Sequence, residues 1–369
     1  MNQLFRWDQT GLFLLALAAG ILPFAVPEVC AAALREGLTL CSGPLLLSLF
    51  PFLVVSRLLI QCPESDLLAL PFRLAAWGIG IRTPCAARVL CIGFLGGFAP
   101  AASAAAQAVR TGQLTAEEAD ALLPACICSG PSFVVLTVGQ SLLGSAELGV
   151  LLFASQITAN YLTAALLNRF AGVHSVEQES AAQASPAPPR LDEILADAAI
   201  TYCKLCGFIL FFRMLAAGAG ALLPAGAGTL CSILLEVCSG CDLASRTGRW
   251  GSLLCCAALS VQGLSVLLQV RTICPAEMTL RPLYRARMLH LPLSLALFYL
   301  LLPGGEADVF STLSARVLLM RRVPPDCALL VFAVCCMAAC TLRSGIRQVE
   351  QKQMARNAGG CCINSKTLL

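Results

Sequence analysis

Uncharged apolar runs follow one another along most of this chain. They occupy residues 9–27, 37–56, 89–109, 121–146, 148–168, 214–235, 250–270, 288–305 and 327–342. Most reach the roughly 18 to 20 residues that a helix needs to cross the hydrocarbon of a bilayer. Runs such as 11–17 do not alternate apolar and polar positions, as the strands of a membrane barrel do. Because lipid offers the backbone no hydrogen-bond partner, the runs predict membrane-spanning helices.

The composition agrees with this interpretation. Only 12% of the 369 residues are charged and 58% are hydrophobic, whereas soluble domains usually carry about 25% charged residues. We therefore predict an all-α fold, a polytopic integral membrane protein with about 8 to 10 membrane helices or half-helices. The run 9–27 is interpreted as a retained first span rather than a signal peptide, because no small-residue cleavage site precedes Pro23 and Pro27.

One polar, proline-rich stretch, residues 173–190, divides the chain. Its composition is typical of an aqueous linker. The predicted organisation is an N-terminal membrane helix at 1–36, a first helical repeat at 37–172, the linker at 173–190, a second helical repeat at 191–303, a C-terminal membrane segment at 304–342 and a basic tail at 343–369.

Two interruptions are expected inside the apolar runs of the first repeat. Gly96-Gly97 predicts one of them. Cys128-Ser129-Gly130-Pro131 predicts the other, because proline is favoured in the first turn of a new helix and Ser-Gly can cap that turn. Between them, Thr115 and Glu118 have the spacing of a capping box at a helix start. In lipid, such breaks must be shielded by protein or line a wet cavity.

A weak internal echo supports two related repeats. A constant offset of 110 aligns Leu95, Gly97 and Phe98 with Leu205, Gly207 and Phe208, and Cys128-Ser129-Gly130 with Cys238-Ser239-Gly240. Chance matches are easy in a chain so rich in Leu, Ala, Gly and Cys, and Cys41-Ser42-Gly43 repeats the motif away from that offset. Duplication and coincidence both stay open at this point.

Basic residues indicate how the chain is oriented. Arg281, Arg285 and Arg287 precede one apolar run, and the basic stretch 343–366 follows the next. If each run crosses once, the two patches lie on the same side, which the positive-inside rule makes cytoplasmic. The C-terminal tail is therefore expected in the cytoplasm, although the arginines at 316–322 in the intervening loop oppose this orientation.

No catalytic constellation is visible. There is no Walker loop, paired-histidine metal motif or nucleophile elbow, and His174 and His290 are the only histidines. The 21 cysteines include CxxC pairs at 203–206 and 238–241, but a metal site of that type needs four ligands. The cysteines are interpreted as small apolar packing residues. We expect no enzyme activity, no metal, no cofactor and no nucleic-acid partner.

Several polar residues are stranded in apolar runs. Glu236 follows a long uncharged stretch, and Gln262 and Gln269 lie on either side of a further apolar segment. Ionisable groups at depth in a membrane are expensive and usually face a cavity or a partner. Two explanations of Glu236 stay open, a cavity-facing carboxylate and a helix end at the interface. The glutamines are equally well explained as hydrogen-bond donors between helices.

Interrupted helices indicate how a solute site is built. Half-helix N-termini present unpaired N–H groups and the positive end of a dipole, which suits a carboxylate, a phosphate or a carbonyl-rich ring. Many secondary transporters place such breaks in two repeats near mid-membrane. The predicted solute-binding residues are Gly96, Gly97, Ser129, Gly130, Pro131, Glu236, Ser239, Gly240, Gln262, Gly263 and Gln269.

The motifs, taken in order, resemble those of a known family. They are Phe50-Pro51-Phe52, the segment GFLGGFAPAA at 93–102, the helix 112–119 leading to 129–133, Glu236 with Gly240, and residues 262–266 with Gln269. Over roughly residues 38–303 they resemble the YlbJ family of sporulation integral membrane proteins, which belongs with the nucleoside-recognition or Gate-domain proteins. The resemblance implies two Gate-like repeats in a multi-pass protein of a bacterial inner membrane, required for spore assembly and moving or recognising a small solute.

The resemblance also implies partners. These are membrane lipid and a small solute, nucleoside-like or a small aromatic acid, while self-association into a homo-oligomer stays open. The chain departs from the family at Gly97-Phe98-Ala99-Pro100, which lacks the tyrosine of Gly-Tyr-Pro, and at Ile127 and Cys128, which replace amides. These changes leave an altered or lost solute specificity open. The alternative function is a structural or assembly protein of the spore envelope.

Overall fold

The computed structural model describes residues 9–171 and 191–302. Within these two ranges all regular structure is helical and no strand occurs, which confirms the all-α prediction. Three predicted segments lie outside the described residues: the linker 173–190, the C-terminal membrane segment 304–342 and the basic tail 343–369. The same holds for residues 1–8 of the predicted N-terminal helix and for residues 172 and 303.

The helices have the length and composition of membrane spans. Four are long and apolar enough to cross a membrane, and five shorter apolar helices accompany them in the described part of the chain. The long ones cover Pro27–Leu47, Ala146–Ala171, Leu191–Leu222 and Gly248–Ile273. The chain is therefore an all-α membrane protein, as the apolar runs predicted.

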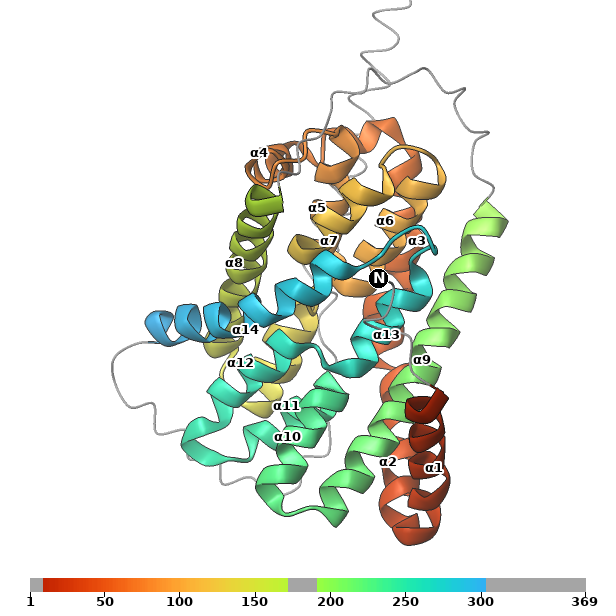
Figure 1. The fold of residues 1–369 in the computed structure, drawn as a ribbon, viewed down its shortest axis with the longest axis vertical. Helices are drawn as coiled ribbons and strands as arrows, with labels where there is room; N and C mark the ends of the chain where they lie inside the picture. The colour runs from red at the N-terminus through yellow and green to blue at the C-terminus, as the bar shows by residue number, and fades with distance from the viewer. Residues whose placement is uncertain (1–8, 172–190, 303–369) are drawn as a thin grey trace, which may run out of the picture.

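Figure 1 shows the order and arrangement of the elements. They are α1 (Gln9–Ala25), α2 (Pro27–Ser42), α3 (Pro44–Gln61), α4 (Leu70–Gly78), α5 (Pro84–Gly96), α6 (Phe98–Arg110), α7 (Ala116–Cys126), the π-helix η2 (Ser132–Leu142), α8 (Ala146–Ala171), α9 (Leu191–Leu222), α10 (Ala225–Leu235), α11 (Val237–Ser245), α12 (Gly251–Val261), α13 (Gly263–Ile273) and α14 (Arg281–Leu301), with short 3-10 turns at Pro63–Asp66 and Gly248–Trp250.

Helices α5 and α6 form a hairpin, called hairpin 1 below, that turns back at Gly97. Just before α5, the Thr83 hydroxyl donates a hydrogen bond to Glu118 near the start of α7 (2.6 Å). At the other end of α5, Gly93 packs against Cys126, the last residue of α7. Helices α5 and α7 therefore run parallel, and α6, which connects them, runs antiparallel to both.

The next crossing, α7 followed by η2, is interrupted as predicted and is called broken helix 1. The chain leaves the helix after Cys126, is extended at Ile127 (φ −82°, ψ 96°) and resumes helical structure at Ser132. Pro131 contributes to the break, because it has no N–H to donate to the carbonyl of Ile127 four residues earlier. The predicted capping box is confirmed, because Thr115 accepts from the Glu118 amide and Glu118 accepts from the Thr115 amide.

A second hairpin and a second broken helix follow after α9. Hairpin 2 consists of α10 and α11 and turns at Glu236, and Gly240 of α11 lies directly against the backbone of Ile233 in α10. Broken helix 2 consists of α12 and α13, separated at Gln262 and Gly263, which both have left-handed backbone angles (φ 64° and 66°). The order hairpin then broken helix thus occurs twice.

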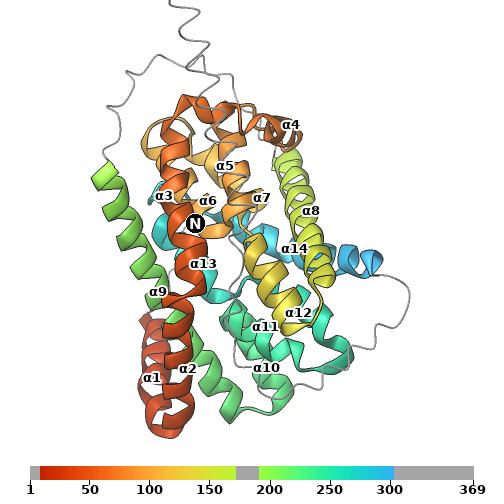
Figure 2. The same cartoon turned by 180° about the vertical axis from the view of Figure 1, so that it is seen from behind.

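The two units are inverted relative to each other. The carboxylate of Asp120 in α7 accepts hydrogen bonds from the amides of Thr279 (2.8 Å) and Leu280 (3.1 Å), just beyond the end of α13. The start of broken helix 1 therefore lies beside the end of broken helix 2. Figures 1 and 2 show hairpin 1 in the half of the bundle that holds α4, and hairpin 2 at the opposite end.

The repeat offset predicted from the sequence is wrong. An offset of 110 pairs Gly97 with Gly207, which lies inside the uninterrupted helix α9. It also pairs Ser129, in broken helix 1, with Ser239, in the first turn of α11 in hairpin 2. The structural counterpart of Gly97 is Glu236, because each forms a hairpin tip. Short sequence matches do not identify this structural correspondence, because they arise easily by chance in a chain dominated by a few residue types.

Small residues allow hairpin 1 to pack tightly. The buried face of α6 consists largely of alanine, and Ala99, Ala101, Ala102, Ala104 and Ala105 have no exposed surface. In a membrane, small side chains let helix backbones approach closely, and this packing replaces the missing hydrophobic drive. Helix α9 packs outside the hairpins against α2, α3 and α10, while α14 packs across α7, α8 and α12.

Candidate functional site

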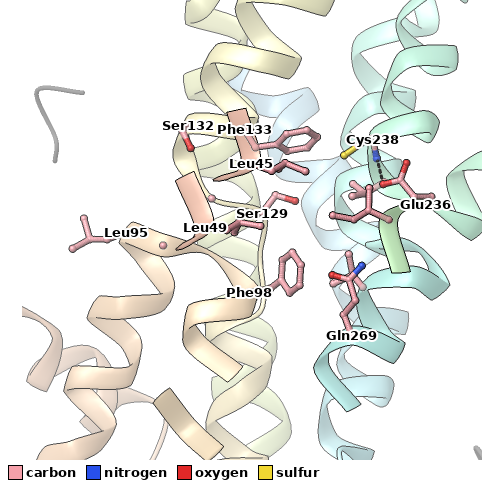
Figure 3. A pocket seen from close by; sticks show the side chains of 15 residues that line it. Leu45, Leu49, Leu95, Phe98, Ser129, Ser132, Phe133, Glu236, Cys238 and Gln269 are labelled. Atoms are coloured by element: carbon pink, nitrogen blue, oxygen red, sulfur yellow. Dashed lines mark hydrogen bonds between the residues drawn. The ribbon is translucent and has the colours of Figure 1, made fainter. Parts of the chain in front are cut away.

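The two hairpin tips and one break meet around a small cavity at the centre of the bundle. Its volume is about 60 Å³, and its walls come from hairpin 1, broken helix 1, hairpin 2, α13 and α3. Of the predicted solute-binding residues, Gly96, Ser129, Gly130, Glu236 and Gln269 line it. Figure 3 shows Ser129, Phe98 and Phe133 on one side, with Glu236, Cys238 and Gln269 facing them.

Glu236 is both a helix cap and a cavity residue. It is 2% exposed, and its two carboxylate oxygens accept hydrogen bonds from the amides of Cys238 (2.8 Å) and Ser239 (2.7 Å). The carboxylate therefore neutralises the positive N-terminus of α11. Glu236 does lie at a helix end, as one of the two explanations proposed. That explanation is wrong in placing the residue in water, because Glu236 is buried where the hairpin tip meets the cavity.

The first unit leaves its helix N-termini open. Neither α6 nor η2 has a side chain that caps its first amides. Phe98 begins α6, Ser132 and Phe133 begin η2, and all three line the cavity. These two N-termini supply the unpaired amides and positive dipole ends that the interrupted helices predicted, whereas α11 does not, because Glu236 occupies its amides.

Gln262 and Gln269 bring buried amides to the same region. The Gln262 amide nitrogen donates to Ser129 Oγ (3.4 Å) and to the Leu259 carbonyl (2.7 Å), and so joins the two breaks. The Gln269 amide nitrogen donates to Ser265 Oγ (2.9 Å). Both side-chain carbonyl oxygens are buried without a hydrogen-bond partner. Gln269 lines the cavity and offers it an unused acceptor, while Gln262 lies behind it.

Two predicted glycines are required by close approach. Gly97 has φ 80° and ψ −164°, a region that side chains avoid, and an added Cβ would lie 2.7 Å from the Gly130 amide nitrogen. Gly263 has φ 66°, and an added Cβ would lie 3.0 Å from the Glu236 amide nitrogen. Each glycine thus lets a hairpin tip rest directly on a break. Neither lines the cavity.

The remaining predicted residues shape the walls. Pro131 immediately precedes η2, where its missing N–H removes no helical hydrogen bond. Ser239 contributes its amide to the Glu236 cap, and Gly240 allows α10 and α11 to touch. The structure therefore places ten of the eleven predicted residues at or within about one turn of a hairpin tip or break, while Gln269 lies further along α13. Only part of the set faces the cavity.

Arg287 is buried at the breaks, which the sequence interpretation missed. It was expected in an aqueous basic patch, but it is 7% exposed. Its Nη2 donates to the Ile127 carbonyl (2.7 Å) and to Asn160 Oδ1 (3.3 Å), and its Nη1 donates to the Ser260 carbonyl (3.3 Å). The expected aqueous position of Arg287 is wrong. Both breaks leave backbone carbonyls without helical partners, and the Arg287 guanidinium donates to a carbonyl from each break.

A polar face on α14 could have revealed this arrangement. Arg287, His290 and Ser294 recur at helical spacing on one face and are all buried. His290 Nε2 lies 3.2 Å from the Gln156 carbonyl, and Ser294 shares a hydrogen bond with Ser260. A polar stripe among apolar residues indicates an interior partner rather than a solvated flank.

The cysteines give no sign of a metal centre. All fifteen cysteines in the described residues are free, and most are buried. Within residues 9–171 and 191–302, no group of three or more histidine, cysteine, aspartate or glutamate side chains converges as metal ligands do. Their burial fits the packing role proposed for them.

Comparisons with known proteins leave the site to be interpreted from its own geometry. No protein family, no curated protein and no solved structure matches this chain.

Proposed function

We propose that this membrane protein binds a small polar solute between the two hairpin tips and moves it across the bilayer. The observation that carries the proposal is the small cavity on which the interrupted elements of both inverted units converge. Secondary transporters commonly build their sites in this way, from discontinuous helices of two inverted repeats. Buried polar groups at depth in a membrane protein also favour a solute path over simple packing.

The cavity walls indicate the chemistry of the solute. The open N-termini of α6 and η2 favour an electronegative group such as a carboxylate or a ring carbonyl. On the facing wall, Glu236 and the unpartnered oxygen of Gln269 accept hydrogen bonds. Phe98 and Phe133 supply aromatic surface. A nucleoside or a small aromatic acid combines these features, and no catalytic step or cofactor is proposed.

Solute entry requires a change of conformation. A volume of about 60 Å³ admits a few water-sized groups, whereas sites for drug-sized ligands enclose roughly 300 to 1,000 Å³. The conformation described therefore leaves too little room for a whole solute of this kind. The hairpin tips rest on the breaks through glycine contacts, so separation of a tip from its break is the movement that would enlarge the cavity.

The resemblance to the YlbJ family supplies the biological context of the proposal. It implies a role in spore assembly, in the inner membrane of an endospore-forming bacterium, with the C-terminal tail in the cytoplasm. Deleting the gene in such a host tests this part, and we expect spores with defective envelopes. Normal spores would contradict the role in spore assembly and would leave the transport proposal to be tested separately.

Uptake into liposomes tests the transport proposal. The full chain is reconstituted and the uptake of labelled nucleosides and small aromatic acids is measured against protein-free liposomes. We expect uptake, reduced at least about tenfold in Glu236→Gln, which loses a charge worth about 1.4 kcal/mol or more to binding. Asp242→Asn is the control, because Asp242 lies on the same helix and pairs with the exposed Arg246. No uptake, and no thermal stabilisation by any solute, would contradict the proposal.

A second candidate function is a structural role in the spore envelope. Two observations favour it: both Glu236 oxygens are already bonded within hairpin 2, and the cavity is small. Under this alternative the broken helices serve packing alone. Glu236→Gln should then leave sporulation intact, whereas removing the tail after residue 342 should impair it. Impaired sporulation in Glu236→Gln, together with normal sporulation after removal of the tail, would favour transport.

A further inference from the structure

A second cavity lies apart from the proposed solute site. Its volume is about 150 Å³, and it is bounded by α3, α6, α9 and the end of α13. The residues that define its chemistry are Arg57, Ser103, Arg110, Asp197, Thr201 and Lys204. One water needs roughly 10 to 15 Å³ of such space, so the cavity accommodates an anion of phosphate size together with water.

Two of the residues that line this cavity carry a buried donor without a hydrogen-bond partner. Ser103 is 3% exposed, and its hydroxyl has no hydrogen-bond partner. Arg57 is 8% exposed, and its Nε likewise lacks a partner, although Nη1 pairs with Asp197. Buried donors in folded proteins are normally paired, because each unpaired one costs free energy. Two of them lining one cavity point to a ligand that accepts hydrogen bonds.

The rim of the cavity adds positive charge. Arg110 is the last residue of α6 and Lys204 projects from α9, and both are exposed. Together with Arg57 they set three cationic groups against the single carboxylate of Asp197, which is itself 60% exposed at its side chain. The residual charge of the lining is therefore positive. An anion, rather than a cation or a neutral solute, complements it.

A packed layer separates the two cavities. Leu53, Ala99, Tyr202 and Leu205 belong to one buried cluster, with Phe98 packed against it. Phe98 lines the central cavity and Leu205 lines the second one. Occupancy of the second cavity does not therefore require the solute path to be open.

We propose that this second cavity binds a phosphate group. A phosphate offers several acceptor oxygens, which match an arginine fork, a lysine ammonium and a hydroxyl held around one space. The lining comes from the end of α3, the end of α6, the beginning of α9 and the end of α13, which gather in the half of the bundle that holds hairpin 1 (Figure 1). Because Arg110 and Lys204 at its rim are exposed, the phosphate can come from an anionic lipid headgroup or from solution.

Thermal unfolding of the full chain in neutral detergent tests the proposal. In one arm inorganic phosphate replaces chloride at constant ionic strength. In the other, phosphatidylglycerol is compared with phosphatidylcholine in mixed micelles. We expect the wild type to be stabilised in at least one arm, and the apparent affinity to fall at least about tenfold in Ser103→Ala and in the double variant Arg110→Gln/Lys204→Gln. Both variants avoid Arg57, whose ion pair with Asp197 contributes to folding.

The double variant Arg35→Gln/Arg249→Gln is the matched control. Both arginines are exposed and lie outside the cavity, so the charge change is the same. Stabilisation by inorganic phosphate that the cavity variants lose assigns a soluble phosphate, and stabilisation by phosphatidylglycerol alone assigns the lipid headgroup. Two results overturn the proposal: no stabilisation in either arm, or equal responses in the cavity variants and the control.

Discussion

The two inverted units share one plan but satisfy their interrupted backbones differently. In the first unit the hairpin turns at a glycine, and the helix starts of α6 and η2 have no side-chain cap. In the second unit the hairpin turns at Glu236, whose carboxylate caps α11. Their breaks differ as well, since broken helix 1 has an extended stretch before a π-helix and broken helix 2 has only two left-handed residues.

This difference assigns separate tasks to the two units. The first unit leaves the starts of α6 and η2 without a side-chain cap beside the cavity, so these positive dipole ends suit an electronegative ligand. In the second unit the Glu236 carboxylate caps α11, so the first amides of that helix are satisfied without a ligand. Arg287 serves both, because it binds a carbonyl from each break. Substitutions at these positions therefore separate what each unit contributes.

Arg287→Met should have the largest effect, because it removes the donor that the two units share. The Ser260 carbonyl and the Asn160 oxygen lose the hydrogen bonds from Arg287, whereas the Ile127 carbonyl still accepts one from Asn160 Nδ2. Each unsatisfied buried group costs about 1 to 3 kcal/mol, so we expect a loss of about 2 to 6 kcal/mol. Thermal unfolding in detergent measures this loss of stability. Arg285→Met is the control, because Arg285 lies on the same helix but is exposed. Equal melting temperatures for the two variants would contradict the role of Arg287.

Gly97→Ala should break the first unit alone. The backbone angles of Gly97 cost about 1 to 3 kcal/mol for any other residue, and the new Cβ would clash with Gly130. We expect a total loss of about 2 to 4 kcal/mol in the free energy of unfolding. Gly144→Ala isolates the backbone part, because Gly144 has φ 76° and nothing within 4 Å of an added Cβ. If the two variants lose the same stability, hairpin 1 does not rest tightly on the break.

Glu236→Ala should weaken the second unit by about 1 to 2 kcal/mol, the usual loss when a helix loses its N-cap. The amides of Cys238 and Ser239 lose their acceptor. Hydrogen exchange should therefore become faster at the start of α11, while the start of α7 is unchanged. Asp242→Asn, which removes a carboxylate from the same helix without uncapping it, should leave both regions protected. Unchanged exchange at α11 in Glu236→Ala would show that the cap is dispensable.

Thr115→Ala should have the smallest effect and sharpen the comparison. Thr115 caps α7, outside both hairpins, through the amide of Glu118 (3.1 Å). We expect a loss of about 1 kcal/mol in unfolding free energy and no change in solute uptake. Liposome assays beside thermal unfolding measure both. A loss of uptake as large as that in Glu236→Gln would mean that the cavity is not the sensitive part of the molecule.

Local chemistry in the sequence was enough to predict several features. Long uncharged runs required membrane helices, because lipid cannot satisfy the backbone. Gly96-Gly97 and Ser129-Gly130-Pro131 predicted interruptions that the structure confirms. The Thr115 capping box was predicted correctly too. In each of these cases the determining atoms lie within one or two helical turns of one another.

Tertiary structure alone decided how these pieces combine. Whether a break turns the chain back, as at Gly97, or lets it continue, as at Ser129, depends on which helix packs against it. Two of the three partners of Arg287 lie 127 and 160 residues away in the chain. The inversion of the two units rests on contacts of similar range, such as that of Asp120 with Thr279. Hydrophobic periodicity and turn propensity act over a few residues, so they determine the elements and their ends. The pairing of distant carbonyls, carboxylates and guanidinium groups is set only when the elements are packed together.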